Sequence, residues 1–193
     1  QALIGKQQVS GRMHPLKKVV LAGLSNSSVW YQYGFVQPQG AVARTATEMI
    51  YIRSTIQSFR ARLVSAFGLT DTCPSVHSLL LARSRNRRIV NAADLFNHLE
   101  ARFENLRLVI LDKDALSDTA KLKELLQAFL CARTVIAMHG SELVLAMLMA
   151  PGATVLELFP FGVEPAHYTP FRTLATIVGH QYHAWRNELK LNG

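Results

Sequence analysis

The sequence has little cysteine, no long apolar run and none of the common glycine-rich nucleotide-binding loops. Its two cysteines, Cys73 and Cys131, are too few for a disulfide framework or a zinc cluster, so we expect two buried thiols. No apolar stretch approaches the ~20 residues that span a bilayer. The missing Gly-x-Gly-x-x-Gly and Walker loops argue against an ordinary dehydrogenase or P-loop ATPase. No serine lies in a Gly-x-Ser-x-Gly turn, so the sequence lacks the nucleophile motif of an α/β-hydrolase triad.

Hydrophobic residues and positive charge are abundant instead. At 49% hydrophobic, the 193 residues can bury a core of about one domain. The formal net charge of +8 predicts an anionic partner, and a nucleotide, a nucleic acid or an acidic membrane would each fit. No nucleic-acid reading motif is present, so we expect no nucleic-acid partner. The chain opens at Gln1 without methionine or a signal-like segment, as a fragment would, and Asn26 heads its one N-glycosylation sequon.

Apolar runs and amphipathic stretches alternate along the chain with short connections. That alternation predicts an α/β protein whose parallel, doubly wound sheet is covered by helices. Asn91, with Asp94 at the third helical position, resembles a capping box, and Tyr182 and Trp185 are expected to anchor the last strand by packing. The predicted strands are 19–24, 78–82, 106–111, 134–138, 153–159 and 181–185. The predicted helices are 45–67, 92–99, 121–130, 143–150 and 168–178.

The stretch 133–160 predicts a strand, a glycine turn, a buried helix and a second strand. At the turn, Gly140 lets the backbone pass close to another group, and Ser141 is expected to cap the helix. A helix start favours an anion, and His139 beside it can hydrogen-bond a phosphate or a leaving diphosphate. The alternative is a histidine satisfied at the sheet edge. Glu142 would repel an anion unless it points away.

Four arginines in six residues follow the predicted strand 78–82, and Arg83 and Arg87 are the two that we single out. The carboxyl ends of strands are where open α/β sheets bind ligands, and a guanidinium can hold phosphate through two hydrogen bonds. A solvated hairpin tip is the alternative. The arginines of 45–67, in contrast, are expected to form a solvated basic face.

Three further features leave alternatives open. Glu157 lies in an apolar strand and needs a partner if buried, either a ribose hydroxyl pair or a basic side chain such as Arg83 or Arg133. The aromatic loop 30–40 fits a stacking surface for a sugar or base, or a hydrophobic plug between layers. Asp112-Lys113-Asp114 has the form of a divalent-metal motif, but Asp114 or Ser117 equally fits a helix cap, and we expect no metal there.

Several blocks of the sequence resemble glycosyltransferase family 61. The strongest is Met138-His-Gly-Ser-Glu-Leu143 followed by the segment 150–160. It is supported by the aromatic loop 30–40, by Arg83 with Asn86-Arg87, and by the segments 167–170 and 184–187. Together these blocks cover about 23–187, so the resemblance extends over most of the chain.

The resemblance implies a GT-B architecture of two Rossmann-like halves. Residues 41–193 would be the C-terminal, donor-binding half, and 1–40 an N-terminal or interdomain segment. The implied activity is inverting transfer of N-acetylglucosamine from UDP-GlcNAc to O-linked mannose on a protein such as α-dystroglycan. The implied setting is the lumen of the endoplasmic reticulum, in a type II membrane protein whose anchor lies outside this chain.

The resemblance also implies roles for single residues. Arg83 and Arg87 would contact the UDP phosphates, with catalytic His139 and the Gly140-Ser141 turn beside them, and Glu157 would face the nucleoside. Such a cationic cradle can replace a metal, so no cofactor is expected. The sequence departs from the family at 142, where a glutamate replaces a neutral residue, and a non-catalytic binder of sugar nucleotides or glycans is the alternative function.

Overall fold

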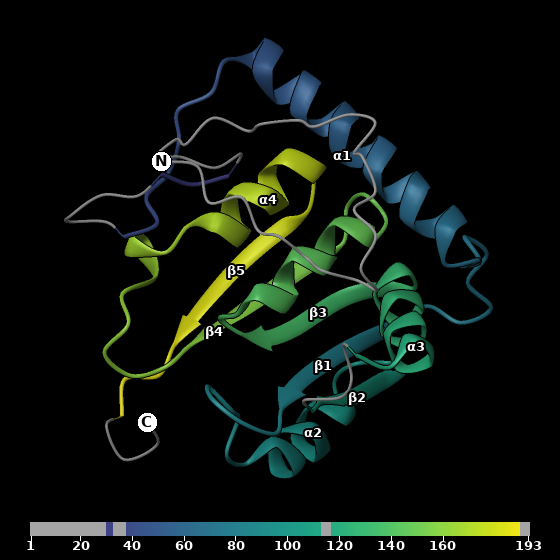
Figure 1. Ribbon diagram of the computed structural model, residues 1–193. Helices are drawn as coiled ribbons and strands as arrows, with labels where there is room; N and C mark the ends of the chain where they lie inside the picture. Colours follow the sequence, from purple (N-terminus) through teal and green to yellow (C-terminus); the bar gives the residue numbers. More distant parts are fainter. Residues whose placement is uncertain (1–29, 33–37, 113–116, 190–193) are drawn as a thin grey trace, which may run out of the picture.

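The computed structural model describes residues 30–32, 38–112 and 117–189 (Figure 1). Asn26, the predicted strand 19–24 and Asp114 lie outside the described residues. Among the described residues, no helix combines the length and the apolar character that crossing a bilayer would require.

Among the described residues, five strands form one sheet, and their parallel arrangement is the one that the sequence predicted. The strand order is β2-β1-β3-β4-β5, and all arrowheads in Figure 1 point to the same edge. Because β2 lies on one side of β1 and β3 on the other, the direction in which strands are added reverses between β1 and β3. The strands are β1 (His77–Arg83), β2 (Leu106–Leu111), β3 (Ala132–Met138), β4 (Thr154–Phe159) and β5 (Gln181–Arg186).

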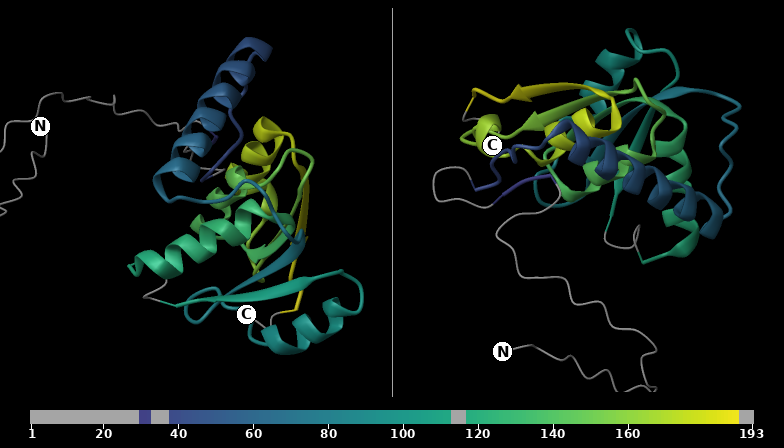
Figure 2. Two further views of the ribbon diagram at one scale, coloured as in Figure 1. Left: turned by 90° about the vertical axis from the view of Figure 1, so that its right-hand side faces the viewer. Right: turned by 90° about the horizontal axis from the view of Figure 1, so that it is seen from above.

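Helices cover the two faces of the sheet unequally. One face is covered by α3, η1 and α4, with α1 packed on α4 and η1, and α2 covers part of the other face; Figure 2 shows the two sides with the sheet turned. The alternation of side chains along each strand separates the cores, since Leu79 and Leu81 face the larger one and Leu80 faces the smaller one. The helices are α1 (Ala46–Ala66), α2 (Ala92–Glu100), α3 (Thr119–Leu130), the 3₁₀ helices η1 (Ser141–Leu148) and η2 (Pro165–His167), and α4 (Pro170–Val178).

Two of the three arginines of α1 dock the helix on its neighbours, whereas Arg62 is exposed, as the predicted solvated face required. Arg53 Nε donates to the carbonyl of Ile177 at 2.6 Å, and Arg60 Nε donates to the carbonyl of Leu148 at 3.0 Å. Both carbonyls lie in the last turns of helices, where backbone acceptors have no intrahelical partner and a cation is favoured. The two arginines therefore fasten α1 across the ends of α4 and η1.

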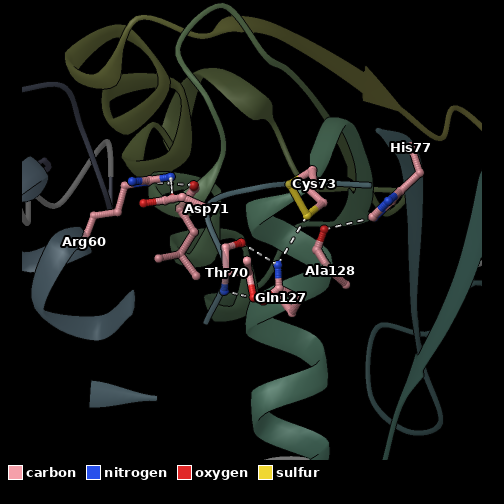
Figure 3. Close-up of a disulfide and its surroundings, with 9 residues drawn as sticks. Arg60, Thr70, Asp71, Cys73, His77, Gln127 and Ala128 are labelled. Carbon is pink, nitrogen blue, oxygen red and sulfur yellow. Dashed lines mark hydrogen bonds and ion pairs between the residues drawn. A yellow bond between two sulfur atoms is a disulfide. The ribbon is translucent and has the colours of Figure 1, made fainter. Parts of the chain in front are cut away.

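The two cysteines form a disulfide, so the expectation of two separate thiols is wrong. Cys73 precedes β1 and Cys131 precedes β3, and their Cα atoms are 5.4 Å apart (Figure 3). The bridge joins the amino-terminal edge of two neighbouring strands, opposite the edge at which Arg83 and His139 lie. Gln127 supports it, because its side-chain amide bonds both the Thr70 backbone and the Cys131 sulfur.

Local details differ from the sequence-based expectations. Asn91 is at the N-cap position of α2 but makes no side-chain capping bond, and Asp118 caps α3 where Asp114 or Ser117 was expected. The segment after His139 is a 3₁₀ helix, and its N-cap position is held by Gly140 instead of Ser141. Trp185 is exposed, because β5 is an edge strand and its outer face has no helix packed on it among the described residues.

Candidate functional site

The carboxyl ends of β1 and β3 bring the predicted site residues together. Arg83 is the last residue of β1, and His139 directly follows β3. These two neighbouring strands flank the point where the strand order reverses, which is where doubly wound sheets open a crevice for ligands. The topology therefore places side chains that are 56 positions apart in sequence at one site.

His139 is held by a buried carboxylate on the next strand. Its Nδ1 lies 2.5 Å from Glu157 Oε1, and the Tyr182 hydroxyl donates to Glu157 Oε2 at 2.6 Å. Glu157 is fully buried, with 0% of its surface exposed. Its partner is therefore a basic side chain, as one of the two sequence-based alternatives expected, but it is His139 and not Arg83 or Arg133. The row His139, Glu157, Tyr182 crosses β3, β4 and β5.

Aromatic rings fix the plane of the His139 imidazole. The ring stacks on Phe159 with centroids 5.1 Å apart, and the rings of Tyr168 and Phe171 lie at 5.4 and 5.7 Å. His139 itself is 9% exposed. Because Nδ1 is occupied by Glu157, Nε2 is the ring nitrogen available to a ligand.

Glu142, which the sequence presented as a difficulty, is neutralised by Arg83. The two side chains form a bidentate ion pair: Nε of Arg83 donates to Oε1 at 2.7 Å, and Nη2 pairs with Oε2. A Cβ on Gly140 would overlap Arg83 Nη2 and both carboxylate oxygens of Glu142. Glycine at 140 thus makes room for the ion pair, and this close approach is the one that the sequence anticipated.

A cavity of about 400 Å³ opens beside this pair. Arg87, His139, Gly140 and Ser141 line one side of it, so four of the predicted site residues share one cavity. Arg87 and the preceding Asn86 have left-handed backbones, with φ of 52° and 37°. This conformation is uncommon outside glycine, and it turns the arginine loop back at the end of β1.

Residues from two further parts of the chain also line the cavity. They are Trp30, Tyr31 and Gln39, and Pro170 and Phe171 at the start of α4. Gln32 and Gly40 pair as an antiparallel bridge, and the carbonyl of Gln39 accepts from both the backbone N–H and the hydroxyl of buried Thr169. Trp30 also packs against the larger core, so this side chain both fills space between layers and lines the cavity.

A second cavity of about 350 Å³ lies on the other side of the ion pair. It shares Ser141 and Val144 with the first and is lined also by Arg83, Arg85 and Glu142. Together the two form one stretch of hollow surface along the carboxyl edge of β1 and β3. A larger hollow of about 810 Å³ surrounds the disulfide end of the sheet and contains none of the predicted site residues.

The metal motif has only one described member. Asp112 Oδ2 lies 3.6 Å from Lys121 Nζ. Within the part of the chain that the structure describes, no group of three or more His, Cys, Asp or Glu side chains has a metal-binding arrangement.

Sequence reasoning missed Tyr182 as a site residue and treated it as a packing anchor. Its hydroxyl is the donor that completes the bonding of Glu157. Burial raises the pKa of Tyr182, and the negative charge of Glu157 raises it further, so the hydroxyl keeps its proton. The available signal was the isolated glutamate in an apolar strand, which requires a buried donor from a neighbouring strand.

Comparison with known proteins decides the family. The family model of glycosyltransferase 61 matches residues 38–156, more than half of the chain. The chain belongs to glycosyltransferase family 61. The matched range contains the arginine loop and the His139-Gly140-Ser141 turn, and it ends one residue before Glu157.

Curated proteins of one name are similar over most of this chain. Protein O-linked-mannose beta-1,4-N-acetylglucosaminyltransferase 2 of Mus musculus is 39% identical over 174 residues, covering 88% of this chain and 29% of the mouse protein. The Xenopus laevis protein of the same name is 38% identical, covering 86% and 28%, and the human one is 37% identical, covering 88% and 29%. The chain spans less than a third of the length of these relatives.

Proposed function

We propose that this chain is the donor-binding part of an inverting glycosyltransferase that moves N-acetylglucosamine from UDP-GlcNAc to O-linked mannose on protein. The family membership and the names of the similar proteins support the reaction class. The observation that carries the proposal is the cavity at the ends of β1 and β3, where Arg87, His139 and the start of η1 face one space. That set of groups suits a diphosphate.

The chemistry of the transfer explains why such a set is useful. The acceptor hydroxyl attacks the anomeric carbon of the sugar, and the bond to the UDP oxygen breaks, so that the diphosphate gains negative charge. Arg87, an N–H of His139 and the backbone N–H groups at the start of η1 would stabilise that charge as it develops. These groups are already in place before the reaction, which lowers the reorganisation that the transition state requires.

We propose that this cradle works without a divalent metal. Arg87 lies in the cavity, and Arg83 lies next to it in the ion pair with Glu142. The Arg87 guanidinium supplies positive charge that a metal ion would otherwise bring to the phosphates, and Arg83 would add a second guanidinium on leaving Glu142.

The disulfide supports a secretory setting. Disulfides persist in oxidising compartments and are rare in the cytosol. The Cys73–Cys131 bridge therefore supports an oxidising compartment. We propose that this compartment is the endoplasmic reticulum lumen, that the protein is a type II membrane protein, and that its acceptor is a protein such as α-dystroglycan. The same proposal places 41–193 as the C-terminal half of a GT-B fold, with acceptor contacts contributed from elsewhere.

The direct test is donor binding by the full-length protein. We expect UDP and UDP-GlcNAc to bind more tightly than GDP-mannose in calorimetry, with Mn²⁺ making no difference. Arg87→Ala should weaken UDP binding about 10- to 100-fold, since hydrogen bonds between charged groups contribute about 1.5–3 kcal/mol. Arg62→Ala is the matched control, because Arg62 is an exposed arginine of α1 that does not line the cavity.

Three outcomes separate the hypotheses. Unchanged UDP affinity in Arg87→Ala would reject the cradle. UDP binding without transfer to a mannosylated peptide would favour the non-catalytic alternative. Loss of binding in Arg62→Ala as well would mean that net charge, and not the cavity, attracts the nucleotide.

A further inference from the structure

Glu157 has a bonding pattern that a ligand-binding carboxylate would not have. Both of its oxygens are taken by protein groups, Oε1 by His139 Nδ1 and Oε2 by the Tyr182 hydroxyl. It is fully buried and lines neither cavity of the site. A carboxylate in this state cannot reach a ribose, so its influence on a bound donor must pass through His139.

We infer that Glu157 and Tyr182 are positioning residues, which fix the tautomer and direction of His139 so that Nε2 faces the donor cavity. The inference rests on the proposed function, because it assigns how the same site holds a diphosphate. His139 is the residue that contacts the ligand. The other two act only through it.

The direction of every hydrogen bond in this row follows from chemistry. An ionised carboxylate only accepts, so the proton between His139 and Glu157 belongs to Nδ1. The Tyr182 hydroxyl must donate to the second oxygen, and burial with the nearby negative charge keeps it protonated. With both carboxylate oxygens held, Glu157 cannot rotate, and the imidazole cannot exchange its two nitrogens.

The buried carboxylate of Glu157 can balance the charge of a positive imidazole that faces an anion. An ionised carboxylate without exposure is costly unless it is paired and hydrogen-bonded. When His139 also carries a proton on Nε2, the Glu157 charge balances the ring, and Nε2–H is presented to the cavity. A leaving diphosphate accepts that hydrogen bond, and Arg87 on the same cavity contributes a second positive group.

Strand register explains how three distant positions align. Glu157 pairs with Ala137 on β3 and with Ala184 on β5, so its side chain lies between small neighbours. His139 is two residues beyond Ala137, and Tyr182 is two residues before Ala184. In parallel strands, residues two positions apart share a face, so all three side chains lie on one face of the sheet.

The decisive experiment is a double-mutant cycle in the full-length protein, with kcat and the donor KM measured separately. We expect Glu157→Gln to lower kcat about 10- to 100-fold with a donor KM changed less than about 3-fold. Tyr182→Phe should lower kcat about 3- to 10-fold in the same manner. In a His139→Gln background, Glu157→Gln should cause no further loss, because a positioning residue has nothing left to position.

A spectroscopic measurement gives a readout that does not depend on turnover. With ¹⁵N-labelled histidine, the His139 signals, assigned by their absence in His139→Gln, should show Nδ1 protonated in the wild type. In Tyr182→Phe the ring should begin to populate both tautomers. This variant keeps the aromatic body of Tyr182, so it remains informative if Glu157→Gln does not fold.

The outcomes also separate this inference from the proposed function. If wild-type protein fails to bind UDP, the proposed function itself is wrong. If UDP binds and depends on Arg87, but Glu157→Gln adds a full further loss to His139→Gln, the positioning role is wrong. An Nε2-protonated, Nδ1-free ring in the wild type would overturn it directly.

Discussion

Removing the Cys73–Cys131 disulfide should lower the free energy of unfolding by about 4 kcal/mol. The bridge closes a segment with a sequence separation of 58 residues. In the chain-entropy treatment, a loop of that length restricts the unfolded chain by about 14 cal/mol/K, or about 4 kcal/mol at 25 °C. The free energy of unfolding of a domain is about 5–15 kcal/mol in total, so the protein without the bridge should still fold but be much less stable.

The assay is urea unfolding of Cys73→Ser/Cys131→Ala beside the wild type, with and without reductant. With a urea dependence of about 2 kcal/mol per molar, the midpoint should fall by about 2 M. Reductant should shift the wild type toward the variant and leave the variant unchanged. UDP affinity of the folded variant should stay within about 2-fold, because the bridge lies at the opposite edge of the sheet from the cavity. A midpoint shift below about 0.5 M, or two titratable thiols in the native protein, would refute the reasoning.

The other predictions concern the ion pair and the pH dependence of stability. Glu142→Gln should raise UDP affinity about 3- to 10-fold in calorimetry, because it releases the guanidinium of Arg83 and removes a negative charge. A lower UDP affinity would show instead that Glu142 holds Arg83 in the position that binds the donor. Gly140→Ala should separate Arg83 from Glu142, because the added Cβ would occupy the space of both side chains. The thermal midpoint should fall by about 2–4 °C for each kcal/mol of unfolding free energy that is lost. An unchanged midpoint would show that Gly140 is not needed for the close approach of the ion pair. Burial lowers the pKa of His77 and of His180 below 6.5, so on acidification these histidines take up protons in the unfolded chain before they do so in the folded protein. Their contribution to the free energy of unfolding should therefore be fully present above about pH 6.5 and be lost as the pH falls. An unfolding midpoint that does not change from pH 7 to 5 would contradict this.

Much of the fold was predictable because it depends on local patterns. Buried parallel strands read as short apolar runs, and β1, β2, β3 and β4 all coincide with such runs. The ends of these strands carry the arginines and His139, so the general position of the site followed from a rule about sheet edges. The capping box of Thr45 with Glu48 at the start of α1 is likewise a local signal that the structure contains.

The partners of charged and sulfur-containing residues were not predictable, because pairing depends on which strands lie side by side. Arg83 and Glu142 are 59 positions apart, and Glu157 and Tyr182 are 25 apart. Cys73 and Cys131 meet only because β3 lies next to β1 and not next to β2. Without that order, a lone glutamate in a strand has several equally reasonable partners, and the sequence alone does not choose among them.

The left-handed backbones of Asn86 and Arg87 at the end of β1 make thermal stability and donor affinity compete. Outside glycine this backbone costs about 1–2 kcal/mol per residue, so Asn86→Gly should give a modestly more thermostable protein. The same change would let the guanidinium of Arg87 sample more orientations in the free protein. Ordering it on nucleotide binding would then cost free energy, and the affinity for the nucleotide would fall. A library selected for melting temperature alone would therefore enrich poor binders at this position, and one selected for binding would retain the strain.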